Sequence, residues 1–242
     1  HYQTTNYAKL SSLISNPLIH DALDKAWNHP PMRRIVNYFG YYREDPRFDQ
    51  EQSRISPTQI RFASGYFQYS ANIESKLTEV RAELLPHVSS VLAKVRQKFE
   101  IKENYSVLHV RRGDYFQNYF NSSIIGALDD DYFIRASNLL DRIPLIILVE
   151  DSDDVKQLKK SLNVSLMLDR SLTSSWETLA IMSGAAQLIG SNSSLSWWGA
   201  RLCSLSGGEV WLPQEWSYWK NIQQENYSFP NCKRIPSSWV VG

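Results

Sequence analysis

The stretch LHVRRGDY, residues 108–115, joins the end of an apolar run to a cluster of charged side chains. Alternation along an extended strand puts His109 and Arg111 on one face and Arg112 on the other. The planar fork of an arginine guanidinium can meet two phosphate oxygens at once. This stretch therefore predicts one half of a phosphate-binding site.

The stretch IGSNSSLSWWGARL, residues 189–202, suits the same ligand through hydroxyl and backbone groups. A strand runs through a glycine into a polar turn, and Ser193 or Ser194 then caps the following helix. The first N–H groups of a helix and the positive end of its dipole attract anions. Trp197 and Trp198 are expected to pack on the sheet and hold this turn. Together the two stretches predict a diphosphate site.

The elements that would position these stretches alternate between short strands and helices. Apolar residues at every third or fourth position predict a helix over 73–99, with a kink or a break at Pro86. Strands are predicted at 106–110, 145–149, 166–168, 187–190 and 209–213, and helices at 131–142, 153–162, 174–185 and 195–203. This is the pattern of an α/β fold with a Rossmann-like parallel sheet. Such sheets bind ligands outside the carboxyl ends of their strands.

The composition excludes several classes of function. The formal net charge is +1, so no broad positive field would hold nucleic acid or an anionic membrane surface. No apolar run approaches the roughly 18 residues that span a bilayer. Two cysteines, Cys203 and Cys232, are far from a disulfide framework.

The two stretches in this order, with GYFQ upstream at 65–68 and VWLPQEW downstream at 210–216, resemble the α1,2-fucosyltransferase family. The resemblance implies a GT-B architecture with a partial N-terminal domain. Residues 1–102 would form that acceptor-side domain and a linking helix, and residues 103–242 a Rossmann-like GDP-sugar-binding domain. The family's GLGNQ loop has no counterpart here, so the chain is expected to be N-terminally incomplete.

By position in the motifs, the resemblance implies catalytic roles for Arg111 and His109, which would face the donor pyrophosphate. Arg111 would stabilise the negative charge that builds on the departing β-phosphate. Donor-binding roles are implied for Arg112, Asp114, Tyr115, Asn192, Ser193 and Ser194. No residue is assigned as the base that takes the proton from the acceptor hydroxyl.

The implied enzyme is an inverting α1,2-fucosyltransferase. It would move fucose from GDP-fucose to the 2-OH of a terminal galactose of a glycan, without a metal or any other cofactor. Its partners would be GDP-fucose and a galactose-terminated acceptor, with no nucleic acid. The second stretch is closer to bacterial members, which implies a cytoplasmic location, at the inner membrane surface. N-glycosylation sequons, one of them at Asn192, leave the Golgi lumen as an alternative.

Three other interpretations stay open. A truncated or degenerate relative would bind GDP-sugar without turnover. A metal-dependent GT-A-type glycosyltransferase would use Asp151 and Asp153, or the acids at 129–131, as ligands of a divalent cation. Each acidic cluster precedes a helix, however, where carboxylates cap and complement the dipole. The tripeptide RGD at 112–114 would suit an adhesion protein. Glu177, three residues after Ser174, predicts a capping box and no catalytic role.

Overall fold

The computed structural model describes residues 41–43, 62–64, 74, 77–113, 115, 125–218 and 227–240. Packing of the chain divides it into two units, His1–Phe67 and Gln68–Gly242. The described residues of the first unit form a two-stranded parallel sheet of β1 (Tyr41–Arg43) and β2 (Phe62–Ser64). The division into functional domains at residues 102 and 103 stays a prediction.

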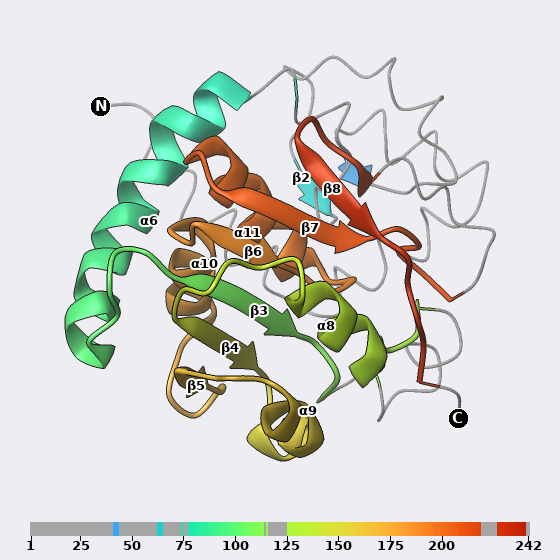
Figure 1. Cartoon of the computed structure of the whole chain (residues 1–242). Coiled ribbons are helices and arrows are strands. Elements are labelled where there is room, and N and C mark those ends of the chain that lie inside the picture. Colours follow the sequence, from blue (N-terminus) through green and yellow to red (C-terminus); the bar gives the residue numbers. More distant parts are fainter. Residues whose placement is uncertain are drawn as a thin grey trace, which may run out of the picture. The chain divides into compact units, whose positions relative to one another are not determined.

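A six-stranded sheet with every neighbouring pair parallel forms the centre of the second unit (Figure 1). Its strands are β3 (Ser106–Val110), β4 (Leu145–Val149), β5 (Leu166–Leu168), β6 (Gln187–Ile189), β7 (Glu209–Pro213) and β8 (Cys232–Ile235). The order is β5-β4-β3-β6-β7-β8, so the sheet grows in one direction from β3 to β5 and in the other from β6 to β8. This is the strand order of a Rossmann fold. The predicted α/β fold with a Rossmann-like parallel sheet is confirmed.

Strand β8 was missing from the sequence-based prediction. Its residues read CKRI, and Lys233 and Arg234 interrupt any apolar alternation. The strand lies at the edge of the sheet and pairs only with β7 among the strands described. Charged side chains are common on edge strands because one side faces solvent, which removes the apolar pattern that reveals a central strand.

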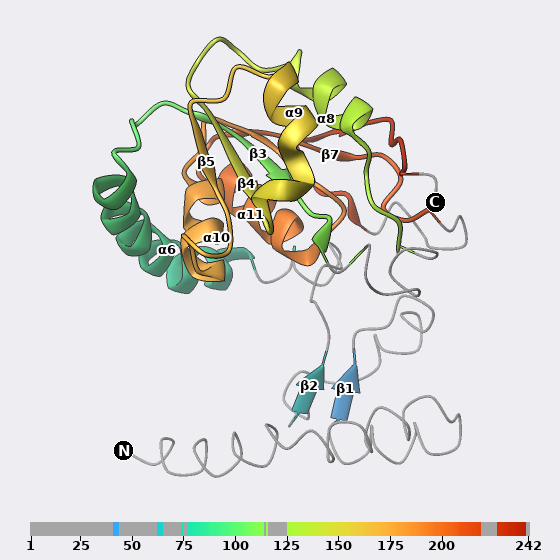
Figure 2. The same ribbon diagram turned by 90° about the horizontal axis from the view of Figure 1, so that it is seen from below.

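Helices cover both faces of the sheet (Figure 2). One face packs against α6 (Leu77–Phe99), α10 (Ser175–Ser183) and α11 (Ser194–Leu205), around a core that includes Val107, Leu188 and Trp197. The other face packs against α8 (Asp130–Ser137), the short 3-10 turn η3 (Ser152–Val155) and α9 (Lys156–Ser161). Among the helices of the described ranges, none is both long and apolar enough to cross a membrane.

The expected break at Pro86 does not occur, because α6 continues through this residue as one helix of 23 residues. A proline removes the hydrogen bond to the carbonyl four residues earlier. Both Pro86 and Ala82 are exposed, so water can satisfy the carbonyl that loses its partner. The predicted apolar stripe is confirmed, with Val88 and Val95 buried against the core.

Candidate functional site

The carboxyl ends of β3 and β6 lie side by side, at the point where the strand order changes direction. Leu108 of β3 pairs with Ile189 of β6, and both strands run parallel. His109 is the penultimate residue of β3, residues 111–113 follow this strand directly, and residues 190–196 follow β6. The structure therefore brings together the two halves of the predicted site, at the position where open parallel sheets bind their ligands.

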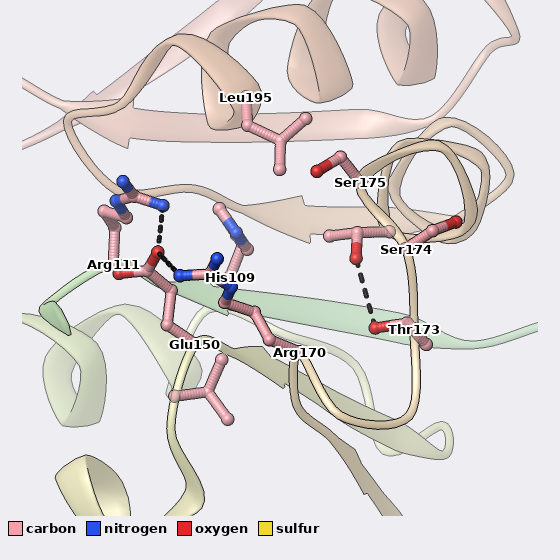
Figure 3. A pocket seen from close by; sticks show the side chains of 10 residues that line it. His109, Arg111, Glu150, Arg170, Thr173, Ser174, Ser175 and Leu195 are labelled. Atoms are coloured by element: carbon pink, nitrogen blue, oxygen red, sulfur yellow. Dashed lines mark hydrogen bonds and ion pairs between the residues drawn. The ribbon is translucent and has the colours of Figure 1, made fainter. Parts of the chain in front are cut away.

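A pocket of about 470 Å³ opens beside these strand ends (Figure 3). Its walls come from the ends of β3 and β4, the loop between β5 and α10, and the first turns of α10 and α11. The lining residues are His109, Arg111, Val149, Glu150, Arg170, Thr173, Ser174, Ser175, Thr178 and Leu195. Guanidinium, imidazole and hydroxyl groups thus surround one carboxylate, which suits an anionic ligand rich in oxygen atoms.

Arg111 lines this pocket with 27% of its side chain exposed, and it forms an ion pair with Glu150. Its guanidinium also lies 5.8 Å from the centre of the Tyr115 ring. Arg170 approaches the same carboxylate, with Nη1 3.7 Å from Oε1 of Glu150. Two guanidinium cations therefore share one carboxylate. The cluster of Arg111, Arg170 and Glu150 has a net positive charge, which suits an anionic ligand.

His109 is buried at the end of β3, and its Nδ1 lies 2.5 Å from Oγ of Ser196 on α11. Burial, together with the neighbouring Arg111 cation, lowers the pKa of His109 to about 3. The imidazole is therefore neutral near pH 7. The position of its single proton depends on the hydrogen bond that Ser196 makes with it.

The turn before α11 is held by its own hydroxyl groups. Ser193 is the N-cap, as one of the two predicted alternatives had it, and its Oγ accepts a hydrogen bond of 3.1 Å from the backbone N–H of Ser196. Ser194 is the first residue of α11 and is half-buried. Tyr115 donates to the backbone carbonyl of Asn192 at 2.8 Å, which ties the two halves of the site together.

Like Ser193 and Tyr115, two further residues with predicted donor-binding roles use their side chains within the protein framework. Arg112 is buried and forms an ion pair of 2.6 Å with Asp130 at the start of α8, and it donates to the carbonyl of Leu128. The Asn192 amide, also buried, donates to the carbonyl of Gly126 at 2.9 Å. Neither residue lines the pocket, and their donor contacts stay predictions. Asp114 lies outside the described residues.

Sequence reasoning assigned no role to Glu150 or Arg170, and it missed the hydroxyl groups of the loop that leads into α10. A signal was present, because Glu150 follows a predicted strand directly and Arg170 follows another by two residues. The predicted capping box is confirmed: Ser174 accepts from the N–H of Glu177, and Glu177 accepts from the N–H of Ser174. This box holds the first turn of α10 against the pocket.

The acidic clusters considered as metal ligands have structural partners. Asp129 caps α8 through the N–H of Tyr132, and Asp151 caps η3 through the N–H of Asp153. Asp153 also pairs with Lys156 at 3.0 Å. Within the ranges that the structure describes, no three His, Cys, Asp or Glu side chains gather in a way that could hold a metal ion.

Arg112 of the RGD tripeptide and the sequon residue Asn192 lie in the framework of the site. Arg112 of the RGD tripeptide is buried, and the sequon residue Asn192 is only 1% exposed. A glycan on Asn192 would need an exposed side-chain amide, whereas this amide is hydrogen-bonded to backbone carbonyls. The side chains of Arg112 and Asn192 are therefore not displayed on the surface.

Comparison with known proteins identifies relatives of the chain. The model of the family described as "Glycosyl transferase family 11" matches residues 37–228. The chain is 30% identical to an O-antigen biosynthesis glycosyltransferase, WbnK, of Escherichia coli, over 47% of this chain and 39% of the relative. It is 30% identical to an alpha-1,2-colitosyltransferase of Escherichia coli, over 55% of this chain and 46% of the relative.

Each alignment thus spans less than half of the length of the curated relative that it matches. The family match, in contrast, covers more than half of this chain and includes both halves of the site. The chain belongs to glycosyl transferase family 11, in agreement with its predicted resemblance to the α1,2-fucosyltransferases.

Proposed function

We propose that the protein transfers fucose from GDP-fucose to a hydroxyl group of a glycan, with inversion and without a metal ion. The observation that carries this proposal is the placement of Arg111 and His109 on one wall of a pocket at the switch point of a Rossmann-like sheet. Nucleotide ligands bind at such switch points. The pocket volume of about 470 Å³ lies within the range of small-molecule sites.

The charges of the pocket suit the departure of a nucleoside diphosphate. As the bond between the sugar and the β-phosphate breaks, negative charge builds on the phosphate oxygens. Arg111 is fixed beside the pocket by its ion pair before any ligand arrives, so its guanidinium needs little reorganisation to meet this charge. Preorganised cations bind the transition state more strongly than the ground state, and this difference accelerates the reaction.

The hydroxyl groups on the opposite wall suit the rest of the donor. Thr173, Ser174, Ser175 and Thr178 line the pocket around the first turn of α10. Hydroxyls can donate and accept, so they can bond to sugar or phosphate oxygens alike. The half-buried Ser194 opens the first turn of α11, whose dipole favours an anion at this end.

The acceptor that we propose is the 2-OH of a terminal galactose. One relative is named as an alpha-1,2-transferase and the other as an enzyme of O-antigen biosynthesis, which supports a glycan acceptor and an α1,2 linkage. The named sugar of the first is colitose, so fucose must be tested against other GDP-sugars. Work at the cytoplasmic face of a bacterial inner membrane, on a surface polysaccharide, is part of this proposal.

Calorimetry with GDP tests the binding half of the proposal. Arg111→Ala is expected to weaken GDP binding at least about tenfold, the scale of one charge-assisted hydrogen bond. Arg142→Ala is the matched control, because Arg142 is exposed just before the amino end of β4, at the opposite edge of the sheet. Equal affinities of the wild type and the Arg111 variant would remove Arg111 from the site.

A transfer assay tests the catalytic half. GDP-fucose and a galactose-terminated oligosaccharide are incubated with the protein, with and without a chelator, and the product linkage is determined by NMR. The expected product carries fucose in α1,2 linkage, and the chelator leaves the rate unchanged. Binding of GDP without any transfer would instead identify a relative that holds the nucleotide sugar without turnover.

A further inference from the structure

We infer that Ser196 is a positioning residue that holds the His109 imidazole with its proton on Nε2, so that His109 donates a hydrogen bond into the pocket. The identity of the acceptor, a phosphate oxygen of the donor, rests on the proposed function. The position of the proton does not, because it follows from hydrogen bonds within the protein.

The hydroxyl of Ser196 is the centre of a hydrogen-bonded cluster. Ser191 donates its backbone N–H to Ser196 Oγ at 3.0 Å, and the Ser193 hydroxyl donates to the same oxygen at 3.1 Å. His109 Nδ1 lies 2.5 Å from this oxygen, and the Ser191 hydroxyl lies 3.1 Å from it. Ser196 and Ser191 are fully buried, so these groups depend on one another for their hydrogen bonds.

A serine hydroxyl can accept two hydrogen bonds and donate one. The backbone N–H of Ser191 and the hydroxyl of Ser193 fill both acceptor positions of Ser196. A proton on His109 Nδ1 would be a third donor aimed at the same oxygen, for which no lone pair remains. The Ser196 proton has two candidate acceptors, His109 Nδ1 at 2.5 Å and the Ser191 hydroxyl at 3.1 Å. It points to the nearer one, because only this leaves Nδ1 with a hydrogen bond, so Nδ1 accepts it.

A neutral imidazole carries one proton, so acceptance at Nδ1 leaves that proton on Nε2. Burial and the Arg111 cation keep the ring neutral, since both lower the pKa of His109. Among the described residues, Nδ1 has Ser196 as its partner and Nε2 has none. Nε2 is thus the nitrogen that remains for the pocket, which His109 lines beside Arg111.

This arrangement makes His109 a hydrogen-bond donor and excludes it as the base for the acceptor hydroxyl. The only nitrogen with a free lone pair in the neutral ring is Nδ1, and Ser196 occupies it. A donor N–H beside a guanidinium complements a phosphate oxygen, as the donors of an oxyanion site do. The base must therefore come from another residue.

NMR spectroscopy tests the position of the proton directly, in the protein without any ligand. Histidine side chains are labelled with ¹⁵N, and His109 is assigned among the five histidines by the loss of its signals in His109→Gln. The expected spectrum shows Nδ1 as the unprotonated nitrogen and Nε2 as the protonated one. A proton on Nδ1 in the wild type would overturn the inference, whatever the variants do.

Substitutions then test whether Ser196 is responsible. Ser196→Ala is expected to lower the ratio of the Nε2–H form to the Nδ1–H form by about tenfold, or about 1.4 kcal/mol, which is the scale of one hydrogen bond. Ser191→Ala is the control, because it removes another hydroxyl of the cluster but keeps the backbone N–H; the ratio should not change. Ser196→Thr should restore the wild-type ratio. An unchanged ratio in Ser196→Ala would also overturn the inference.

Addition of GDP separates this inference from the proposed function. If GDP binds as proposed, the Nε2 proton should shift to lower field as it meets a phosphate oxygen. If the proton is on Nε2 but GDP changes no His109 signal, the proposed function fails while the role of Ser196 stands. If GDP binds as proposed but Nδ1 carries the proton, the role of Ser196 fails while the proposed function stands.

Discussion

Arg111 and Glu150 form an ion pair on the wall of the pocket, and the same carboxylate oxygen lies 3.7 Å from Arg170. Glu150 thus occupies a place between two guanidinium groups, where an incoming phosphate would also be attracted. Gly113 leaves the room for this carboxylate, because a Cβ atom on Gly113 would lie only 2.2 Å from Glu150 Oε2. The pair orients Arg111 and at the same time opposes an anionic ligand.

Replacing Glu150 by glutamine separates these two effects. Glu150→Gln removes the negative charge and keeps the shape, so repulsion of a diphosphate falls. We expect GDP affinity to rise by at least about fivefold, since two unit charges about 4 Å apart interact by about 1 kcal/mol even in bulk water, and only 10% of the Glu150 side chain is exposed. Titration calorimetry at low salt measures the change. Glu209→Gln is the control, because Glu209 is exposed and pairs with Lys233 at the amino end of β7. A loss of affinity would show that orientation of Arg111 outweighs repulsion.

The two arginines should differ in how salt affects their contribution. The side chain of Arg170 is 78% exposed, whereas that of Arg111 is 27% exposed. Arg170→Ala should weaken GDP binding by about threefold at low salt, and the difference should vanish near 1 M salt, where screening is nearly complete. The larger loss of GDP affinity in Arg111→Ala should persist near 1 M salt. Parallel salt dependence in both alanine variants would contradict this distinction.

Arg111→Lys should recover only part of the affinity that Arg111→Ala loses, because lysine lacks the bidentate fork.

Arg112 is expected to act on stability and not on donor binding. Its removal leaves Asp130 without its cation and the carbonyl of Leu128 without its donor. Breaking a buried ion pair on one side costs about 3 to 5 kcal/mol, and the half-buried Asp130 places this pair near the lower value. Urea denaturation of Arg112→Ala should show a free energy of unfolding lower by about 3 kcal/mol. GDP affinity of the folded variant should stay within about twofold of the wild type. The opposite pattern would support a donor contact for Arg112.

The sequence predicted the interior strands β3, β4, β6 and β7 because their apolar runs record burial on both faces. It also predicted β5, which lies at an edge of the sheet and is partly buried, because its residues LML are all apolar. β3, β4, β5 and β7 begin and end where predicted, and β6 ends one residue earlier. It also predicted that the two stretches meet, since both follow strands of one parallel sheet. The sequence could not predict which of the two arginines lines the pocket. Alternation separated Arg112 from Arg111, but the ion-pair partner of Arg112 is Asp130, 18 residues further along the chain, and no local pattern reveals this pair.

The other residues of the pocket follow the same logic. Glu150 and Arg170 become part of the site only because β4 and β5 lie next to β3, and strand order is a property of the whole fold. The Ser196 contact with His109 joins residues 87 positions apart. Local patterns identify caps such as Ser193, whereas contacts between distant segments need the structure.

Acid should destabilise the protein through His109. In the folded state the pKa of His109 is lowered to about 3, whereas in the unfolded chain it is about 6.5. As the pH falls below about 6.5, the unfolded state binds a proton that the folded state does not, so stability decreases until about pH 3. The contribution of this one group is up to about 1.4 kcal/mol for each pH unit.

The variant His109→Gln removes this contribution, while the remaining titratable groups are the same in both proteins. The free energy of unfolding, measured by urea denaturation at about pH 7, 6 and 5, should therefore fall more steeply in the wild type than in the variant. If the free energy of unfolding depends on pH in the same way in the wild type and in the variant, His109 has the same pKa in the folded and unfolded states. That result would contradict a buried, neutral imidazole.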